Sequence, residues 1–383
     1  MPWALLAAAC LGMFAASSSG TTRAPFLLDM ARDLSASLTM VANLMAMTSV
    51  AWGASSLVAG AGSDRWGRRP FLIGGPLGLA AALAGVAVSP GYWSVALAVT
   101  LAGTFAGGFT GVIMAEASAR TVDRQRGRAL GWVMAGQSFS LLLGVPLAAW
   151  IGTYIGWRGV ALAVAVTAVV AALGLLVTTL APAGAPTRPA AARPSMRGAL
   201  SGPVLRLLTM GVTERVCYGL SVVYFATFLQ ATYGLTPAGV AIPLGVVALG
   251  NILGTVAGGH LADRLPHRLR TFALAMSASA VIALALYGWT PGLAITVGIG
   301  FAYIFANAVA RPALMAALAN VPDEIRGTVL GLNVTSASFG WLGAAAVGGW
   351  VMSSVGFGGF GPLAAASALT GAVLGFGGLG TRR

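Results

Sequence analysis

Residues Gly60 to Pro70 read GAGSDRWGRRP, and about two hundred residues later Gly258 to Arg270 read GGHLADRLPHRLR. Each stretch comes at the end of a long apolar run. In each, a Gly stands four residues before an Asp-Arg pair, and further Arg residues follow at once. Because the same charged turn occurs twice, the sequence predicts that the chain is built from two copies of one unit.

A second turn repeats in the same register. Asp123 to Gly131 reads DRQRGRALG, and Asp323 to Gly331 reads DEIRGTVLG, so that Asp, Arg, Gly, Leu and Gly recur at a constant offset of 200 residues. Two separate loops in registers that agree to within one residue indicate a duplicated unit of roughly 180 residues, as in internally repeated transporter folds. Each half should therefore contain the same helices.

The composition is that of a membrane protein. Hydrophobic residues make up 57% of the chain and charged residues only 8%. A helix needs about 20 apolar residues to cross a bilayer, and it must be a helix because lipid offers no partner for unpaired backbone groups. The twelve predicted helices span residues 3–22, 38–60, 70–89, 93–117, 129–151, 158–181, 204–229, 238–260, 271–289, 292–318, 328–353 and 358–378.

We therefore expect an all-α, polytopic membrane protein with twelve transmembrane helices in two pseudo-symmetric six-helix bundles. The first bundle should span residues 1–181 and the second residues 204–383. Between them, residues 182–203 are rich in Pro, Ala, Gly and Arg and show no helical stripe, which is typical of a linker.

The formal net charge of +13 is a topology signal. It comes from 22 Arg and no Lys, and most of the Arg residues lie in alternate loops. The positive-inside rule then places the linker and both termini in the cytoplasm, and the chain in the inner (plasma) membrane. This distribution argues against a nucleic-acid partner, since the charge is divided among loops that face one side of a bilayer.

Enzyme and metal motifs are missing from the sequence. Cys10 and Cys217 both fall in predicted helices, which argues against a disulfide framework or a thiolate metal site. There is no H-E-x-x-H and no Walker motif, and the lack of Lys excludes a Lys-dependent phosphate loop. We expect no catalytic residues, no metal and no cofactor, and no ATP hydrolysis by this chain.

The first charged turn fits the pattern G-x-x-x-D-R-x-G-R-R at every position and resembles the cytoplasmic loop signature of the major facilitator superfamily. The resemblance implies a conformational gate, a set of contacts that stabilises one conformational state of the transporter and is broken in the other state. Asp64 can accept hydrogen bonds from Arg68 and from backbone N–H groups at the start of the next helix. Gly67 would allow the chain to bend there, and Gly60 would allow two helices to approach closely. The implied gate residues are Gly60, Asp64, Arg65, Gly67, Arg68 and Arg69, with Asp263 and Arg264 in the second copy and Glu116 as a candidate partner of Arg68 or Arg65.

Alternatively, these are solvated loop charges that only obey the positive-inside rule. The second copy fits less well, because Pro266 stands where the pattern has Gly.

The fifth predicted helix carries another resemblance. The run LGVPLAAWIGTYIGWR, residues 143–158, resembles the corresponding region of drug:proton antiporters, most of all the arabinose (sugar) efflux permease-like branch. Gly and Pro are also common in membrane helices generally, which is the alternative explanation. One departure affects the mechanism, because the fourth helix lacks the R-x-x-x-G whose Arg is tied to proton coupling in many antiporters.

Glu214 and Arg311 are therefore the next candidates for proton coupling, because they lie well inside the seventh and tenth predicted helices. A charge at such depth costs roughly 2.5–3.5 kcal/mol, so it needs a partner or a water-filled cavity. If the two pair, Glu214 is the candidate proton-coupling residue and Arg311 its modulator, since a nearby cation favours the charged carboxylate. The alternatives are a structural ion pair, or a pair between Glu214 and Arg215 on the same helix.

Polar and aromatic residues in apolar helices are candidates for the substrate cavity. A single residue of this kind is more often part of an interhelical hydrogen bond than a substrate ligand. The candidates are Asn43, Gln137, Tyr218, Tyr224, Tyr303, Asn307 and Asn333.

Together these patterns predict a secondary transporter that works as a monomer in the lipid bilayer by alternating access. The expected activity is proton-coupled efflux of a small organic molecule, drug-like or sugar-like, so that the partners are a small-molecule substrate and protons. These motifs do not determine the direction of transport, and uptake by symport is the alternative within transport. A non-transporting membrane sensor and an intramembrane enzyme are the alternatives from other classes.

Overall fold

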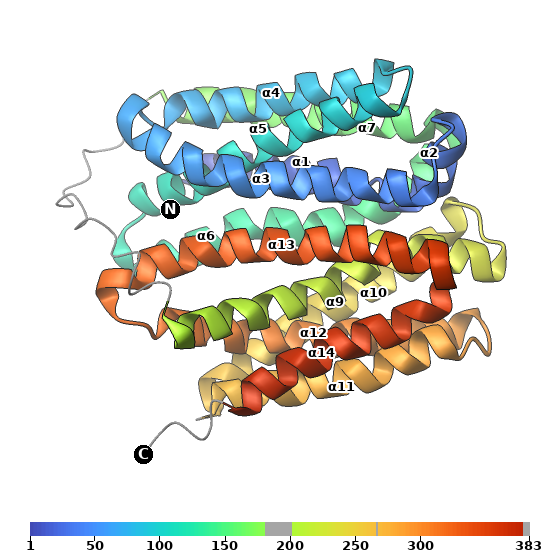
Figure 1. The fold of residues 1–383 in the computed structure, drawn as a ribbon. Coiled ribbons are helices and arrows are strands. Elements are labelled where there is room, and N and C mark those ends of the chain that lie inside the picture. The colour runs from blue at the N-terminus through green and yellow to red at the C-terminus, as the bar shows by residue number, and fades with distance from the viewer. Residues whose placement is uncertain (181–200, 266, 378–383) are drawn as a thin grey trace. The chain divides into compact units, whose positions relative to one another are not determined.

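A computed structural model describes residues 1–180, 201–265 and 267–377, and within them the side chains of a few further residues are left out. Asp64 and Asp263, two residues of the expected gate, belong to the latter group, so their side chains lie outside the described residues. Across the described part, all regular secondary structure is helical (Figure 1), and the all-α prediction is confirmed.

The helices follow the predicted apolar runs closely. In the first half they are α1 (Trp3–Thr21), α2 (Leu27–Asp33), α3 (Leu38–Trp66), α4 (Arg69–Val88), α5 (Tyr92–Ala119), α6 (Asp123–Phe139) and α7 (Val145–Thr178). In the second half they are α9 (Gly202–Tyr233), α10 (Ala241–Arg264), α11 (Arg268–Gly288), α12 (Leu293–Ala319), α13 (Asp323–Val355) and α14 (Phe360–Gly377). Short turns η1 (Ala24–Phe26), η2 (Ser140–Gly144), η3 (Ala238–Val240) and η4 (Phe357–Gly359) connect some of them.

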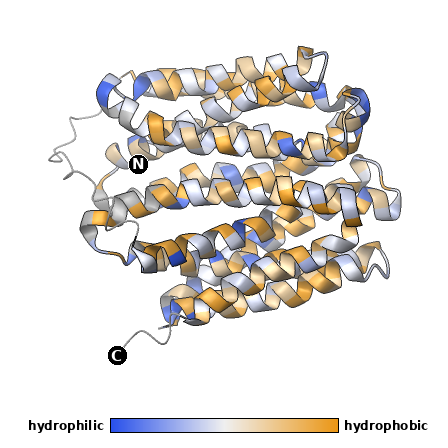
Figure 2. Cartoon of the chain, viewed as in Figure 1, coloured by the Kyte–Doolittle hydropathy of each residue, from blue (hydrophilic) through white to orange (hydrophobic). Residues whose placement is uncertain are grey.

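Ten segments of the described chain are long and apolar enough to cross a membrane. One of them, Gly127–Thr178, has 52 residues and breaks at Gly156, whose φ of 67° is not helical, so it provides two crossings. The 33-residue α13 is a further helix of sufficient length. Twelve crossings therefore fit the structure. Figure 2 shows hydrophobic residues along the helices and hydrophilic ones mostly at their ends.

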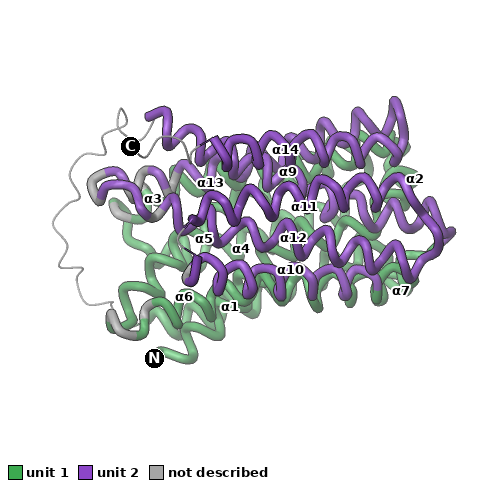
Figure 3. The backbone as a smooth tube through the Cα atoms, turned by 90° about the horizontal axis from the view of Figure 1, so that it is seen from below, with its two compact units in different colours: residues 1–189, 235–242 green, residues 190–234, 243–383 purple. Residues whose placement is uncertain are grey.

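The chain divides into two compact units (Figure 3). Unit 1 comprises residues 1–189 and 235–242, and unit 2 comprises residues 190–234 and 243–383. Residues 235–242 group with unit 1 because η3 packs against α7. Most of the expected linker, 182–203, lies outside the described residues, so its boundaries stay a prediction.

Glycine allows two helices of unit 1 to touch. A Cβ on Gly103 or Gly107 of α5 would collide with the backbone carbonyls of Thr48 and Trp52 of α3. Among the described residues, a Cβ on Gly60 would have no neighbour within 4 Å, so a close approach there stays a prediction. The close contact between α3 and α5 that the structure shows is made by glycines of α5.

The helix-five region bends as its Pro146 suggests. η2 is a five-residue π-turn immediately before α7, and Pro146 stands at the start of that helix. Proline has no backbone N–H to give to the preceding turn, and such local widenings are a usual response. The buried Ser140 of η2 accepts a 2.9 Å hydrogen bond from Ser18 of α1.

Candidate functional site

An ion pair lies inside the membrane-spanning part of unit 2. Arg311 of α12 donates from Nη2 and Nε to the same carboxylate oxygen, Oε1 of Glu214 on α9, at 2.8 and 3.2 Å. Glu214 is buried, with 1% of its surface exposed. The expected pair is therefore present, joining two helices that are far apart in sequence.

Glu214 has a second cationic partner. Arg215 Nε lies 3.4 Å from Glu214 Oε2, so each carboxylate oxygen faces one guanidinium group. The sequence offered Arg311 and Arg215 as alternatives, and the structure shows both. The carboxylate is desolvated and held from two sides, the arrangement that a buried charge requires.

An aromatic pair borders the two Arg side chains. The ring of Tyr218 lies 4.7 Å from the guanidinium carbon of Arg311 and 5.9 Å from that of Arg215. Trp341 of α13 meets Tyr218 edge to face, with ring centroids 5.7 Å apart. Stacking cations against aromatic faces stabilises them where water is scarce.

Close packing fixes the position of these charges. A Cβ on Gly340 of α13 would collide with the Cβ of Arg215, so only glycine lets the two helices meet there. Between α9 and α12, Tyr303 donates a 2.9 Å hydrogen bond to the Cys217 carbonyl, and Asn307 Nδ2 lies 3.5 Å from the Glu214 carbonyl. Sequence reasoning missed Gly340, because a single glycine among many gives no signal.

The expected cavity residues of unit 2 occupy different environments. Tyr218 belongs to the charged cluster. Tyr224 and Tyr303 are fully buried, and Tyr224 donates a 2.7 Å hydrogen bond to the Ala345 carbonyl. Asn307 is also fully buried, with its Oδ1 unpartnered in the described structure. Asn333 is half-buried, and its Nδ2 lies 3.4 Å from Met315 Sδ. These contacts are the interhelical type that the sequence offered as the alternative.

The two cavity candidates of unit 1 lie on α3 and α6. Asn43 Oδ1 is buried without a hydrogen-bond partner in the described structure, and Gln137 is half-buried. An apolar cavity of about 420 Å³ opens between α1 and α6, and Gln137 is not among its lining residues. It has a volume suited to a drug-sized molecule. Its lining includes Trp3, Cys10, Phe14, Trp132 and Phe139.

The charged turn of unit 1 contains a second carboxylate between two Arg residues. Arg68 Nη1 lies 3.3 Å from Glu116 Oε2 and also donates to the Ala115 carbonyl. Arg120 Nε lies 2.6 Å from Glu116 Oε1. Arg68 is therefore the partner of Glu116, while Arg65 lies over the ring of Trp66.

The other described residues of the expected gate are more exposed to solvent than Arg68 and Glu116. Gly67 has φ 81°, a conformation in which glycine is favoured, and it ends α3 as the pattern suggested. Arg65, Arg69 and Arg264 are exposed.

The second copy of the turn repeats the backbone contact without the carboxylate. Arg268, 200 residues after Arg68, donates from Nη1 to the Ala316 carbonyl at 3.2 Å. Ala316 lies within one residue of the position 200 residues after Ala115, the acceptor of Arg68. The repeat is thus visible in equivalent hydrogen bonds, and only the first copy has an ion pair in the described structure.

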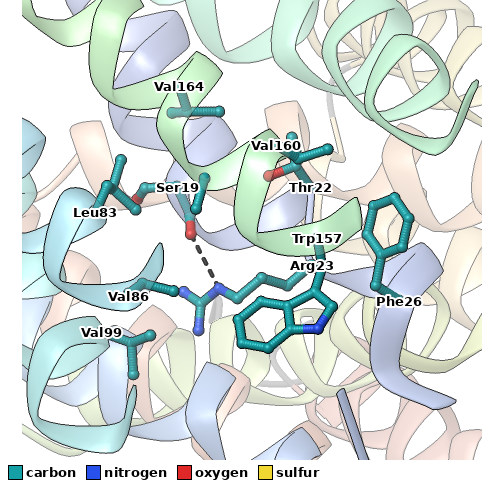
Figure 4. A pocket seen from close by; sticks show the side chains of 11 residues that line it. Ser19, Thr22, Arg23, Phe26, Leu83, Val86, Val99, Trp157, Val160 and Val164 are labelled. Atoms are coloured by element: carbon teal, nitrogen blue, oxygen red, sulfur yellow. Dashed lines mark hydrogen bonds between the residues drawn. The ribbon is translucent and has the colours of Figure 1, made fainter. Parts of the chain in front are cut away.

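Arg23 is a buried cation at the other end of unit 1 (Figure 4). It donates from Nε to the Ser19 carbonyl, from Nη1 to the Leu44 carbonyl and from Nη2 to Thr48 Oγ1, at 3.0, 3.4 and 2.9 Å. Figure 4 shows the Trp157 ring beside it, next to a cavity of about 20 Å³. Arg23 follows directly on the first predicted helix, residues 3–22, and the sequence gives no sign of its burial.

Trp157 and Arg158 of the helix-five motif both bind Asp33. Trp157 Nε1 and Arg158 Nη1 lie 2.8 and 3.0 Å from Asp33 Oδ2, and Arg158 stacks on Trp157 at 4.1 Å. The motif residues therefore fasten α7 to the short α2.

Among the described residues no group of His, Cys, Asp and Glu could hold a metal ion.

Comparison with known proteins gives this architecture a family. The model of the Major Facilitator Superfamily matches residues 9–345, with a second match over residues 207–380. The chain belongs to this superfamily. A bacterial homologue of the human lysosomal transporter Spinster has the same fold, with a TM-score of 0.78 and 15% identity over 97% of this chain and 93% of that one.

Sequence relatives include transport proteins and a regulator. The chain is 29% identical to the chloramphenicol resistance protein of Streptomyces lividans and 26% identical to the inner membrane transport protein YdhP of Escherichia coli O157:H7. Each match covers 70% of this chain and 68% of the relative. It is also 26% identical to the transcription regulatory protein OpdE of Pseudomonas aeruginosa, over 78% of this chain and 75% of that one. The fold and family are those of multi-pass transporters of small molecules and not those of enzymes.

Proposed function

We propose that the chain is a proton-coupled exporter of a small organic molecule, and that Glu214 carries the proton. The observation that carries the proposal is a buried carboxylate, 1% exposed, whose two oxygens are held by Arg311 and Arg215. A carboxylate in this setting can exist in two states, charged and paired or neutral and released, and each state favours a different arrangement of the helices that supply the partners.

The depth of Glu214 supports this role. It lies 12 residues after the first residue of the 32-residue α9 and 19 before the last, which is about 18 and 29 Å along the helix. The other acidic side chains that the structure describes, Asp29, Asp33 and Glu116, stand near helix ends. Glu214 is thus the described acid best placed to carry a proton through the apolar layer.

The expected cycle joins this pair to the charged turns. Protonation of Glu214 removes the charge that holds Arg311, which weakens the contact between α9 and α12. The ion pairs of Arg68 and Arg120 with Glu116 fasten α4 and α5 at the end of unit 1, and in our proposal they stabilise one state of the cycle. Alternating access would then be a change in the balance between two packed arrangements.

Export is the direction that the name of the Streptomyces relative supports, since resistance to a compound follows when the compound leaves the cell. Proton-coupled uptake is the alternative. The name of the Pseudomonas relative supports a second candidate function, a membrane sensor that does not transport. We further propose that the protein works as a monomer in the inner membrane with both termini in the cytoplasm, as the Arg distribution indicates.

Transport by the purified protein tests the proposal. The full chain in liposomes, with a pH gradient imposed, should move chloramphenicol against its concentration gradient, and the flux should reverse when the gradient is reversed. No flux of any tested compound in either direction, with protein that is folded and inserted, would favour the sensor.

Labelling tests the proposed orientation. In a chain whose Cys10 and Cys217 are replaced by Ser, a single cysteine at Pro90, after α4, should react with an impermeant reagent added outside intact cells. A single cysteine at Ser195, which lies outside the described residues, should react only after the cells are opened. Labelling of Ser195→Cys from outside would show that the orientation is inverted.

A further inference from the structure

The charges around Glu214 do not cancel. One carboxylate faces two guanidinium groups, those of Arg215 and Arg311, inside membrane-spanning helices. In the described part of unit 2 there is no other acidic side chain. Asp323, at the start of α13, stands 17 residues before Gly340, which is about 25 Å along the helix. The cluster therefore carries one excess positive charge where such a charge is expensive.

The excess charge belongs mainly to Arg215. Arg311 directs two N–H groups at Glu214, the closer at 2.8 Å, whereas the contact of Arg215 Nε with Glu214 is longer, at 3.4 Å. A guanidinium group carries five N–H donors. Arg215 has no other hydrogen bond to the described residues, so most of its donors are free. The side chain of Arg215 is 23% exposed.

The surroundings of Arg215 suit a flat ring with an oxygen acceptor. Gly340 packs against its Cβ and so anchors the base of the side chain. The Tyr218 ring lies 5.9 Å from the guanidinium carbon of Arg215, and Trp341 packs edge to face against Tyr218. Guanidinium donors match carboxylate and carbonyl oxygens in geometry, and aromatic side chains supply the apolar contact that a ring requires.

We propose that Arg215 binds an oxygen acceptor group of the transported molecule, a carboxylate or a carbonyl, and that the excess positive charge of the cluster rejects organic cations. This inference rests on the proposed function and names the substrate class of the same site. An acceptor group would complete the hydrogen bonds of Arg215 without taking Arg311 from Glu214. A cation would meet repulsion from two guanidinium groups and attraction from a single carboxylate that is already paired.

Three probes that share one ring test the charge preference. Benzoate is an anion, benzamide is uncharged with a carbonyl acceptor, and benzylammonium is a cation. Binding of each to the purified full chain can be measured by ligand-observed NMR. The wild-type protein should bind benzoate and benzamide at least about tenfold more tightly than benzylammonium, the factor expected for one charge-assisted hydrogen bond. The relative affinities for benzoate and benzamide show whether the site prefers a charged or an uncharged acceptor group.

Variants of Arg215 test whether this residue causes the charge preference. Arg215→Gln should weaken benzoate binding by about tenfold and bring benzylammonium to a similar affinity. Arg215→Lys keeps the charge and should still reject benzylammonium, while losing part of the benzamide affinity because the planar fork is gone. The matched control is Arg206→Gln on the same helix, because Arg206 donates to the Leu374 carbonyl and should not alter the ratio of the three affinities.

Three results would overturn the inference: benzylammonium bound by the wild type as tightly as benzoate, an unchanged ratio in Arg215→Gln protein that unfolds at the wild-type temperature, or no binding of either acceptor probe. Equilibrium binding needs no pH gradient, so the inference can hold even if proton-coupled transport fails. Conversely, transport that depends on Glu214 can hold even if charge selectivity fails.

Discussion

Glu214→Gln should lose gradient-driven transport by about a hundredfold or more while it still binds substrate and exchanges it across the bilayer. Glutamine has nearly the shape of a protonated glutamate but cannot give up or take a proton. The side chain would therefore mimic the neutral state permanently, and Arg311 and Arg215 would face an uncharged oxygen instead of a carboxylate. Substrate binding should persist because the helices remain packed at Gly340 and Tyr303.

Proteoliposomes separate the two activities. Flux is measured once with a pH gradient and once as exchange of labelled for unlabelled substrate at equal pH. Asp29→Asn is the matched control, since Asp29 is a partly exposed carboxylate paired with Arg32 at the end of unit 1, and it should transport normally. If Glu214→Gln keeps full gradient-driven flux, Glu214 is structural, and Glu116 becomes the next candidate for the proton.

Glu116→Ala should lose clearly more stability than Arg268→Ala in the second copy of the turn. It leaves Arg68 and Arg120 without their shared carboxylate, and their side chains are only 24% and 16% exposed. Breaking a buried ion pair costs 3–5 kcal/mol, and the partial exposure of both Arg residues reduces this to about 2 kcal/mol. Transport should also slow, because the proposed cycle uses these pairs to stabilise one state.

The second copy of the turn provides the control for Glu116. Among the contacts of the described residues, Arg268→Ala removes a hydrogen bond to the Ala316 carbonyl, which is worth about 1 kcal/mol. Thermal unfolding of both variants in detergent should therefore show a clearly larger loss for Glu116→Ala. Equal losses would mean that the carboxylate adds nothing to the contact that both turns share.

The sequence predicted most of the fold because its signals were long or repeated. Apolar runs of about 20 residues have one stable solution in a bilayer, so the helices follow them within a few residues in most cases. The duplication reappears in the contacts of Arg68 and Arg268, each of which donates to a carbonyl near the end of a neighbouring helix, Ala115 of α5 and Ala316 of α12. The pairing of Glu214 with Arg311 was also predictable, since each of two deep charges needs a partner.

Details that depend on helix rotation were not predictable. Arg215 follows Glu214 directly, and the sequence could not show that both guanidinium groups reach the same carboxylate. Arg23 follows directly on the first predicted helix, yet it is buried and bound to α3. The close approach at Gly103 and Gly107 was not predicted, because the effect of a glycine depends on which neighbour it faces.

Infrared difference spectroscopy tests most directly whether Glu214 carries the proton. Acidifying wild-type protein in a lipid film should produce the carbonyl stretching band of a protonated carboxylic acid, shifted as expected for an apolar site. That band should be missing from Glu214→Gln and unchanged in Asp29→Asn. A band of full size in Glu214→Gln would place the proton on another residue and contradict the account.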